Sequence, residues 1–437
     1  MADERTKRKY QIMMNFGWTY AIISQKKVRF EKAEEESCMK ILMVNVPFSG
    51  HINPTLALAE ELVRRGHKVS YILNNEWKEQ IEGIGAEFIP YMNHGDFWVE
   101  LKNGHPKHVF KVLQMWKYVY DTIMAVGEQY DVLIYEFYTF IAYAAGRRLE
   151  LKVIRQFTTF AVNENNINIM LSSDNREMKL LKNKLLLKLI TKIVCGKRKL
   201  STENILTEIT KVPVKANIVY TSKDFQINKE EFGEEYCFAG PMISKRNCDI
   251  HIPYEKITGK IIYISLGTIQ NEQISFYKKC IDAWKASDDV SVIMSVGKKT
   301  DIQKLMPFPH NFYIYHYVPQ LEVLEKSSVF ITHGGMNSVN EGLYFENRIL
   351  GIPMDVDQYA VVEQVEKLKL GYRLEKERVT PELLREKVKE LLLDDEIGHK
   401  VKDMSMIMRN AGGVKRAAEF VETVVWTKQC GRGNRKI

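Results

Sequence analysis

The stretch that decides the fold is His333-Gly334-Gly335-Met336-Asn337-Ser338-Val339-Asn340-Glu341-Gly342, which directly follows an apolar segment at residues 329–332. The apolar segment predicts a buried strand, and the polar stretch predicts a glycine turn that opens a helix. Glycines let a phosphate approach the backbone, and a helix N-terminus offers unpaired N–H groups and the positive end of the helix dipole. Glu341 lies four residues after Asn337, on the same helix face, where it could accept hydrogen bonds from both hydroxyls of a ribose.

Alternating strand and helix patterns surround this stretch. In the second half, strands are predicted at residues 260–266, 290–296, 312–317, 329–332 and 349–352, with a helix at 274–286. In the first half, strands are predicted from residue 39 and at 67–73, 131–135 and 153–157, with helices at 55–65 and 140–149. Such alternation is typical of a parallel sheet covered on both faces. We therefore predict an α/β fold of two Rossmann-like domains that face each other across a cleft.

The chain of 437 residues is long enough for two or three domains. We divide it into an extension at residues 1–38, a first domain at 39–245, a second domain at 246–425 and a basic tail at 426–437. The extension is set apart because it carries no comparable strand or helix pattern. Residues 1–38 are interpreted either as an N-terminal extension of the folded chain or as sequence upstream of a true start at Met39.

The net charge of +8 comes from local segments. Residues 179–199 hold eight basic residues and no acid, and the extension and the tail are also basic. The remainder of the chain is mildly acidic, which argues against a nucleic-acid-binding face. No apolar run reaches the ~18 residues that a membrane span needs. The six cysteines are scattered without paired spacing, which disfavours a zinc site or disulfide scaffold and favours a cytoplasmic location.

A second polar motif, Ser49-Gly50-His51-Ile52-Asn53-Pro54, follows the first predicted strand. We interpret it as a loop that faces a substrate or phosphate. The pKa of histidine lies near neutrality, so His51 is suited to removing a proton from a hydroxyl group.

The second half of the chain contains three elements that together resemble the donor-binding signature of the UDP-glycosyltransferase family, especially its bacterial macrolide-type members. In sequence order they are Tyr317…Gln320, His333-Gly334-Gly335…Glu341 and Asp357-Gln358. Matches also occur at Ser265-Leu266-Gly267-Thr268 and around Gly412-Gly413, so the resemblance covers Met39 to about Val425. It implies the GT-B fold and an inverting, metal-independent transfer of a hexose, glucose in particular, from a UDP-sugar co-substrate to a hydroxyl of an acceptor. It implies no further cofactor, although bacterial relatives also use TDP-deoxysugars.

The resemblance also implies roles for individual residues. Tyr317 would stack on the base and Gln320 would read its edge, while Glu341 would bind the ribose. The diphosphate and the donor sugar would be held by the remaining donor-binding residues: Thr268, His333, Gly334, Gly335, Asn337, Ser338, Asp357 and Gln358. An alternative treats Asp355 and Asp357 as a DxD metal site, because two carboxylates and a diphosphate could hold Mg²⁺.

The resemblance makes His51 the general base. The family places an aspartate after the strand at 131–135 to orient the histidine, and this chain has Glu136 there. Asp131 is the rival, although its place at the strand start favours a capping role. Two other functions remain open: a nucleotide-sugar epimerase on the same scaffold, and a non-catalytic nucleotide-sugar-binding protein.

Aromatic residues crowd the first half, and we expect most of them in the core. Residues that follow strand ends, namely Phe137, Tyr138 and the segment Thr158–Phe160, could line a pocket for a lipophilic acceptor. Residues 179–199 alternate lysine with leucine and isoleucine at near-helical spacing, with Lys184, Lys188 and Lys192 on one stripe. Such a helix could contact an anionic membrane peripherally, or could be a solvated helix with its lysine stems directed outward.

Overall fold

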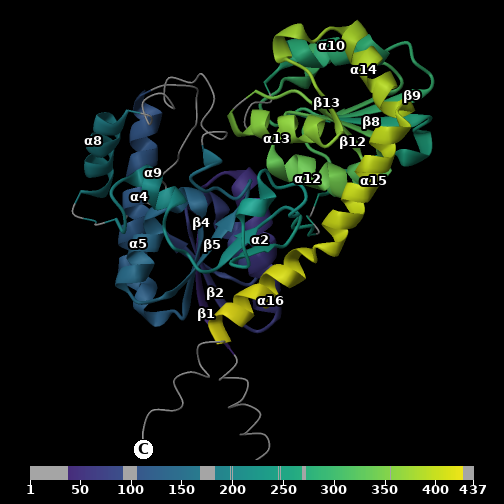
Figure 1. The fold of residues 1–437 in the computed structure, drawn as a ribbon. Coiled ribbons are helices and arrows are strands. Elements are labelled where there is room, and N and C mark those ends of the chain that lie inside the picture. The colour runs from purple at the N-terminus through teal and green to yellow at the C-terminus, as the bar shows by residue number, and fades with distance from the viewer. Residues whose placement is uncertain are drawn as a thin grey trace, which may run out of the picture.

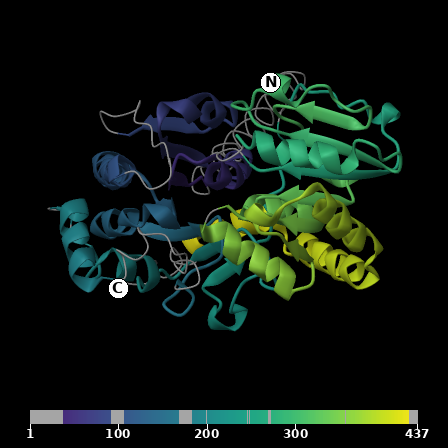
Figure 2. The same cartoon turned by 90° about the horizontal axis from the view of Figure 1, so that it is seen from above.

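The structure is a computed structural model that describes residues 38–91, 106–167, 183–196, 198, 200–244, 246, 248–267, 272–354 and 356–426. Most of the predicted extension and nearly all of the basic tail lie outside the described residues. Within them, two α/β domains are arranged side by side (Figures 1 and 2). Both sheets are parallel, which confirms the predicted fold class.

The first domain is built on a seven-stranded sheet in the order β3-β2-β1-β4-β5-β6-β7. Its strands are β1 (Lys40–Val44), β2 (Lys68–Leu73), β3 (Glu87–Pro90), β4 (Val132–Glu136), β5 (Lys152–Phe157), β6 (Asn217–Val219) and β7 (Tyr236–Phe238). The helices are α2 (Ser49–Arg64), α3 (Lys78–Gly83), α4 (Pro106–Val126), α5 (Ile141–Arg148), α8 (Lys184–Cys195) and α9 (Ile205–Thr210). The central strands β1 and β4 are apolar except for Lys40 and Glu136 at their ends, because helices cover both faces of the sheet.

The second domain is built on a six-stranded sheet in the order β10-β9-β8-β11-β12-β13. Its strands are β8 (Lys260–Ser265), β9 (Val290–Ser295), β10 (Phe312–Tyr315), β11 (Val329–Thr332), β12 (Arg348–Gly351) and β13 (Gly371–Arg373). Helices follow as α10 (Ile274–Trp284), α11 (Gln320–Lys326), α12 (Met336–Tyr344), α13 (Val356–Lys367), α14 (Pro381–Leu393), α15 (Asp395–Asn410) and α16 (Gly413–Trp426). In both sheets the strand order reverses beside the first strand, and such switch points are where α/β sheets bind ligands.

The segment 49–54, which we predict as a loop, is helical, so that prediction is wrong. Helix α2 begins at Ser49, and the carbonyl of Phe48 accepts from the backbone N–H groups of His51 and Ile52 at 2.8 and 2.9 Å. Pro54 lies inside the helix, where it has no N–H to donate. The connection between β1 and α2 is therefore short, and His51 is held on a regular element.

The last helix departs from the predicted linear division of the chain. Helix α16 follows the second domain in sequence but packs against α2 of the first domain (Figure 1). Its residues Ala417, Ala418, Val421 and Val425 are buried in the core that also contains β1, β2 and β4. These apolar residues recur at helical spacing and need a surface to cover them, which the first domain supplies.

Polar contacts also join the two domains. The buried side chain of Asn340 on α12 donates to the carbonyl of Tyr220 at 2.9 Å and accepts from the hydroxyl of Thr221 at 2.8 Å. On α16, Glu422 accepts from Arg65 at 2.8 Å and lies 3.1 Å from Nε2 of His67. These contacts fix α12 against the segment that follows β6, and α16 against the end of α2.

Among the described residues, no helix combines the length and the apolar character required to cross a bilayer. The cysteines at 38, 195, 237, 248 and 280 are unpaired thiols. The cytoplasmic location stays a prediction.

The contact between α16 and the first domain gives a testable prediction. Val421 is fully buried there, and Val421→Ala removes two methyl groups and leaves a cavity. We expect the free energy of unfolding in urea to fall by about 2 kcal/mol. Lys415→Ala, on the exposed side of the same helix, should change it by less than about 0.5 kcal/mol. Equal effects of the two substitutions would contradict the packing of α16.

Candidate active site

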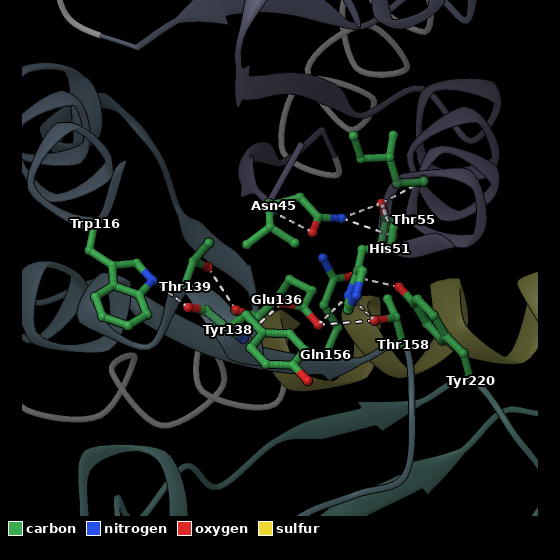
Figure 3. Close-up of polar contacts among 12 residues, drawn as sticks. Asn45, His51, Thr55, Trp116, Glu136, Tyr138, Thr139, Gln156, Thr158 and Tyr220 are labelled. Carbon is green, nitrogen blue, oxygen red and sulfur yellow. Dashed lines mark hydrogen bonds and ion pairs between the residues drawn. The ribbon is translucent and has the colours of Figure 1, made fainter. Parts of the chain in front are cut away.

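The structure brings His51 and Glu136 together at the switch point of the first sheet (Figure 3). His51 lies in the first turn of α2, directly after β1, and Glu136 is the last residue of the neighbouring strand β4. Nδ1 of His51 is 3.2 Å from Oε1 of Glu136. The carboxylate is fully buried, whereas the histidine side chain keeps 20% of its surface exposed. A partly exposed imidazole on a buried acid is suited to exchanging a proton with a bound molecule.

Thr158 completes this group through hydrogen bonds, a role that differs from the pocket-lining place expected for residues 158–160. Its hydroxyl lies 2.6 Å from Nδ1 of His51 and 3.0 Å from Oε1 of Glu136. The hydroxyl has one proton, and the buried carboxylate is the acceptor that most needs it. The threonine then accepts from Nδ1–H of the histidine, which leaves Nε2 with a lone pair. The only sequence signal was the place of Thr158 directly after a strand end.

Neighbouring residues hold both members of the pair. Asn45, directly after β1, donates to the backbone carbonyl of His51 at 3.0 Å and to the hydroxyl of Thr55 at 2.9 Å. The second carboxylate oxygen of Glu136 accepts from the backbone N–H of Tyr138 at 2.8 Å. The histidine and the acid are therefore positioned by contacts within the first domain.

Asp131 does not reach this group. Its carboxylate accepts from the backbone N–H of Lys40 at 2.7 Å, where β1 begins. Asp131 thus lies at the opposite end of the sheet from Glu136, in the capping role that its position favours.

Two aromatic rings border the histidine. The ring of Tyr138 meets His51 edge-on at 5.2 Å between centroids, and Phe48 does so at 6.2 Å. Both are half-buried. The other predicted pocket-lining aromatics, Phe137 and Phe160, are buried in the core. The apolar border of His51 therefore consists of Phe48 and Tyr138.

The turn after β11 forms the corresponding site in the second domain. Gly334 has φ of 85°, a conformation that suits glycine, and Gly335 caps α12. A Cβ added at Gly267 or Gly335 would lie 2.6 Å from the ring of His333. The two glycines thus make room for the imidazole, and loss of hydration lowers the pKa of His333 from 6.5 to about 4. His333 is neutral at pH 7 and can donate one hydrogen bond.

Glu341 lies in α12 with 1% of its surface exposed. Its carboxylate accepts from Gln320 at 2.7 Å and from Asn337 at 3.0 Å, and it forms a two-pronged ion pair with Arg246. Sequence reasoning missed Arg246, which lies in the connection between the domains and belongs to no motif. A carboxylate has about four acceptor positions, so these donors use all of them.

The other predicted donor-binding residues are distributed around the same turn. Tyr317 follows β10 and is 39% exposed, with Nζ of Lys298 5.5 Å from its ring centroid. Ser338 lies half-buried in the first turn of α12. Asp357 and Gln358 lie half-buried at the start of α13, and the side-chain amide oxygen of Gln358 accepts from the backbone N–H of Met354 at 2.9 Å. Thr268 and Asp355 lie outside the described residues.

The two sites belong to adjacent elements, because α2, which carries His51, contacts α12, which begins at the glycine turn. Within the part of the chain that the structure describes, no group of three or more His, Cys, Asp or Glu side chains could hold a metal ion. Asp355, one of the two ligands of the alternative metal site, lies outside the described residues.

Two family descriptions match the chain. Residues 49–154 match the glycosyltransferase family 28 N-terminal domain, and residues 261–419 match its C-terminal domain. These ranges contain His51 and Glu136 in the first and the complete glycine turn in the second.

Full-length relatives are also similar. The uncharacterized UDP-glucosyltransferase YojK of Bacillus subtilis (strain 168) is 32% identical over 407 residues, which cover 89% of this chain and 98% of the relative. The NDP-glycosyltransferase YjiC of the same strain is 34% identical over 394 residues, covering 87% and 96%. The crystal structure of CalG4, the calicheamicin glycosyltransferase, superposes with a TM-score of 0.76 at 25% identity, covering 91% and 99%.

The low pKa of His333 predicts a pH dependence of stability. His333 binds a proton near pH 6.5 in the unfolded chain but only near pH 4 in the folded chain. The contribution of neutral His333 to the free energy of unfolding is therefore complete above pH 6.5 and is lost as the pH falls from 6.5 to 4. Because His333 is only half-buried by area, we expect a loss of roughly 1–2 kcal/mol between pH 7 and pH 5. His333→Gln should remove this part of the loss in urea unfolding. Parallel pH profiles of the two proteins would contradict it.

Proposed function

This chain belongs to the UDP-glycosyltransferase family and is a glycosyltransferase, and from that premise we propose its donor, its acceptor and its mechanism. We propose that it transfers a hexose, glucose in particular, from a UDP-sugar to a hydroxyl of a lipophilic small molecule. The transfer would invert the configuration at the anomeric carbon and would need no metal ion. The observation that carries the proposal is the contact of His51 with a buried carboxylate at the switch point of the first sheet.

In the proposed reaction, Nε2 of His51 removes the proton from the acceptor hydroxyl. The acceptor oxygen forms a bond to the anomeric carbon as the bond from that carbon to the UDP oxygen breaks, and UDP leaves with the electron pair. Attack from the face opposite UDP inverts the configuration. Glu136 stabilises the imidazolium that forms, and Thr158 holds the histidine in the tautomer with Nε2 free to act as a base.

We propose that the second domain binds the donor. The backbone N–H groups at the start of α12, with Ser338 and neutral His333, would bind the diphosphate, because a helix N-terminus favours anions. Tyr317 would stack on the uracil, with Gln320 at its edge. Asp357 and Gln358 would bind hydroxyls of the sugar, and a glucose donor agrees with the similarity to a UDP-glucosyltransferase.

Glu341 would bind the ribose, and this requires an exchange of partners. In the structure, Arg246, Gln320 and Asn337 already donate hydrogen bonds to its acceptor positions. We propose that the ribose hydroxyls replace Arg246, because its side chain is 31% exposed and its guanidinium could be rehydrated. The buried carboxylate would keep hydrogen-bond donors before and after the exchange.

The lipophilic acceptor is supported by the aromatic border of His51. The rings of Phe48 and Tyr138 lie beside the base, and an apolar acceptor could bury surface against them while its hydroxyl reaches Nε2. Incubation with UDP-glucose and a library of hydroxylated compounds, followed by mass spectrometry for a hexose-sized gain, tests the function. A library without a single glycosylated product, with UDP binding intact, would count against it.

The catalytic pair gives a prediction about rate. His51→Ala should lower transfer ~10²–10⁴-fold, because the acceptor proton then has no base, while UDP affinity stays unchanged. Glu136→Gln should lower the rate by a smaller factor, since the imidazolium loses its counter-charge. The measurement is initial-rate kinetics alongside calorimetric UDP binding.

Two matched substitutions sharpen this experiment. Thr158→Val removes the hydroxyl and should lower kcat with little change in KM, whereas Thr158→Ser keeps it and should restore most of the rate. Asp131→Asn, at the far end of the sheet, should leave the rate nearly unchanged. Normal transfer by His51→Ala would refute the mechanism, and a crippled Asp131→Asn beside an active Glu136→Gln would refute the choice of partner.

The donor site gives a prediction about binding. Glu341→Ala should weaken UDP binding by about 1.5–3 kcal/mol, the contribution of charge-assisted hydrogen bonds. Calorimetry should give the same UDP affinity with and without a chelator. Binding that the chelator abolishes would instead favour the metal site at Asp355 and Asp357. Glu231→Ala, an exposed acid of the first domain, is the control for general charge effects.

A further inference from the structure

Helix α8 lies at the outer edge of the first domain (Figure 1). It packs along α4, and its buried residues Leu187 and Cys195 belong to the core of that domain. The side chain of Asn183 caps its start, accepting from the backbone N–H groups of Leu185 and Leu186 at 3.1 and 3.2 Å. One face of a well-capped helix is thus attached to the domain.

The opposite face of α8 is apolar as well. Leu185 is 80% exposed, Leu189 54% and Ile193 48%, and these residues follow one another at intervals of four. They therefore form one stripe along the helix. Lys188 and Lys192 are exposed beside this stripe. Single exposed apolar residues are common, but three of them aligned on one helix expose a continuous apolar surface.

This face does not fit the solvated helix that the sequence left open. In a solvated helix the lysines would cover the outward face and the leucines would turn to the protein. Here the described outward side chains are three aliphatic residues interleaved with two lysines. That combination matches a helix that lies in a membrane interface, with its apolar side chains at the acyl boundary and its lysines at lipid phosphates.

We propose that α8 binds the surface of an anionic lipid membrane through Leu185, Leu189 and Ile193, with Lys188 and Lys192 pairing with lipid phosphates. The positive charge of the segment supports an anionic lipid partner, because residues 179–199 contain eight basic residues and no acid. Lysines near an anionic surface strengthen such binding in a salt-dependent way. The proposal stands on this helix alone and does not depend on the proposed sugar transfer.

The test is co-sedimentation of the full chain with lipid vesicles, at low and high salt. Vesicles of phosphatidylcholine with phosphatidylglycerol should bind the protein, and vesicles of phosphatidylcholine alone should bind it much less. Replacing Leu185, Leu189 and Ile193 together with serine should weaken binding at least about tenfold, since the insertion is lost. Replacing Lys188 and Lys192 with glutamine should weaken it about fivefold per lysine and reduce its salt dependence.

A matched control replaces Leu393 and Met406, which are 69% and 48% exposed on other helices, with serine. This variant should bind vesicles like the unmodified protein. Absence of binding by the unmodified protein would overturn the proposal, as would equal loss in the control. The proposal would also be overturned if the unmodified protein self-associated without binding vesicles and the α8 serine variant did not self-associate. A second copy of the chain would then be the partner that covers this face of α8. Because no substrate is used, the result is independent of whether sugar transfer is found.

Discussion

In-register pairing of β1 with β4 brings two strand ends together, and the candidate active site depends on this contact. Val44 at the end of β1 pairs with Tyr135, so the next residue of β4, Glu136, lies beside the turn that leads to His51. Pairing of β4 with β5 sets Glu136 against Gln156, which puts Thr158 just beyond. Side chains alternate along a strand, so a slip of one residue would turn Glu136 to the other face of the sheet. The buried apolar residues of these strands oppose such a slip.

The second sheet has the same arrangement of strands, but different residues lie at its strand ends. Its strand order also reverses between the first and fourth strands, and there the chain supplies glycines and a helix N-terminus instead of an acid and a base. A reacting hydroxyl and a diphosphate would thus be bound by separate domains. The contact of α12 with α2, the pairing of Asn340 with Thr221 and the return of α16 keep the two strand-end regions adjacent.

Local patterns in the sequence predicted the central strands and the glycine turn, because each depends on residues close together in the chain. The His51–Glu136 pair, whose members lie 85 residues apart, was predicted only through the resemblance to a known family. The helical start at Ser49 was missed, since Gly50 and Pro54 favour a loop and only the contacts of Asn45 and Phe48 override that preference. The return of α16 was missed because its apolar stripe does not specify which domain covers it. Arg246 and Thr158 were missed because their partners lie 95 and 107 residues away.

In the described part of each domain, a buried carboxylate lies near the strand ends, and it is held by three hydrogen-bonding residues. Glu136 has Thr158, His51 and a backbone N–H, while Glu341 has Arg246, Gln320 and Asn337. A buried carboxylate without partners costs several kcal/mol, and these donors offset that cost. The difference between them is the place of their hydrogen-bond donors. The donors of Glu136 lie at the start of α2 and directly after β4 and β5, all within the first domain, which suits a group that would stay in place during proton transfer. One hydrogen-bond donor of Glu341, Arg246, lies in the connection between the domains. A ligand that replaced Arg246 would therefore change the contacts of the segment that joins the two domains when it bound to the second domain.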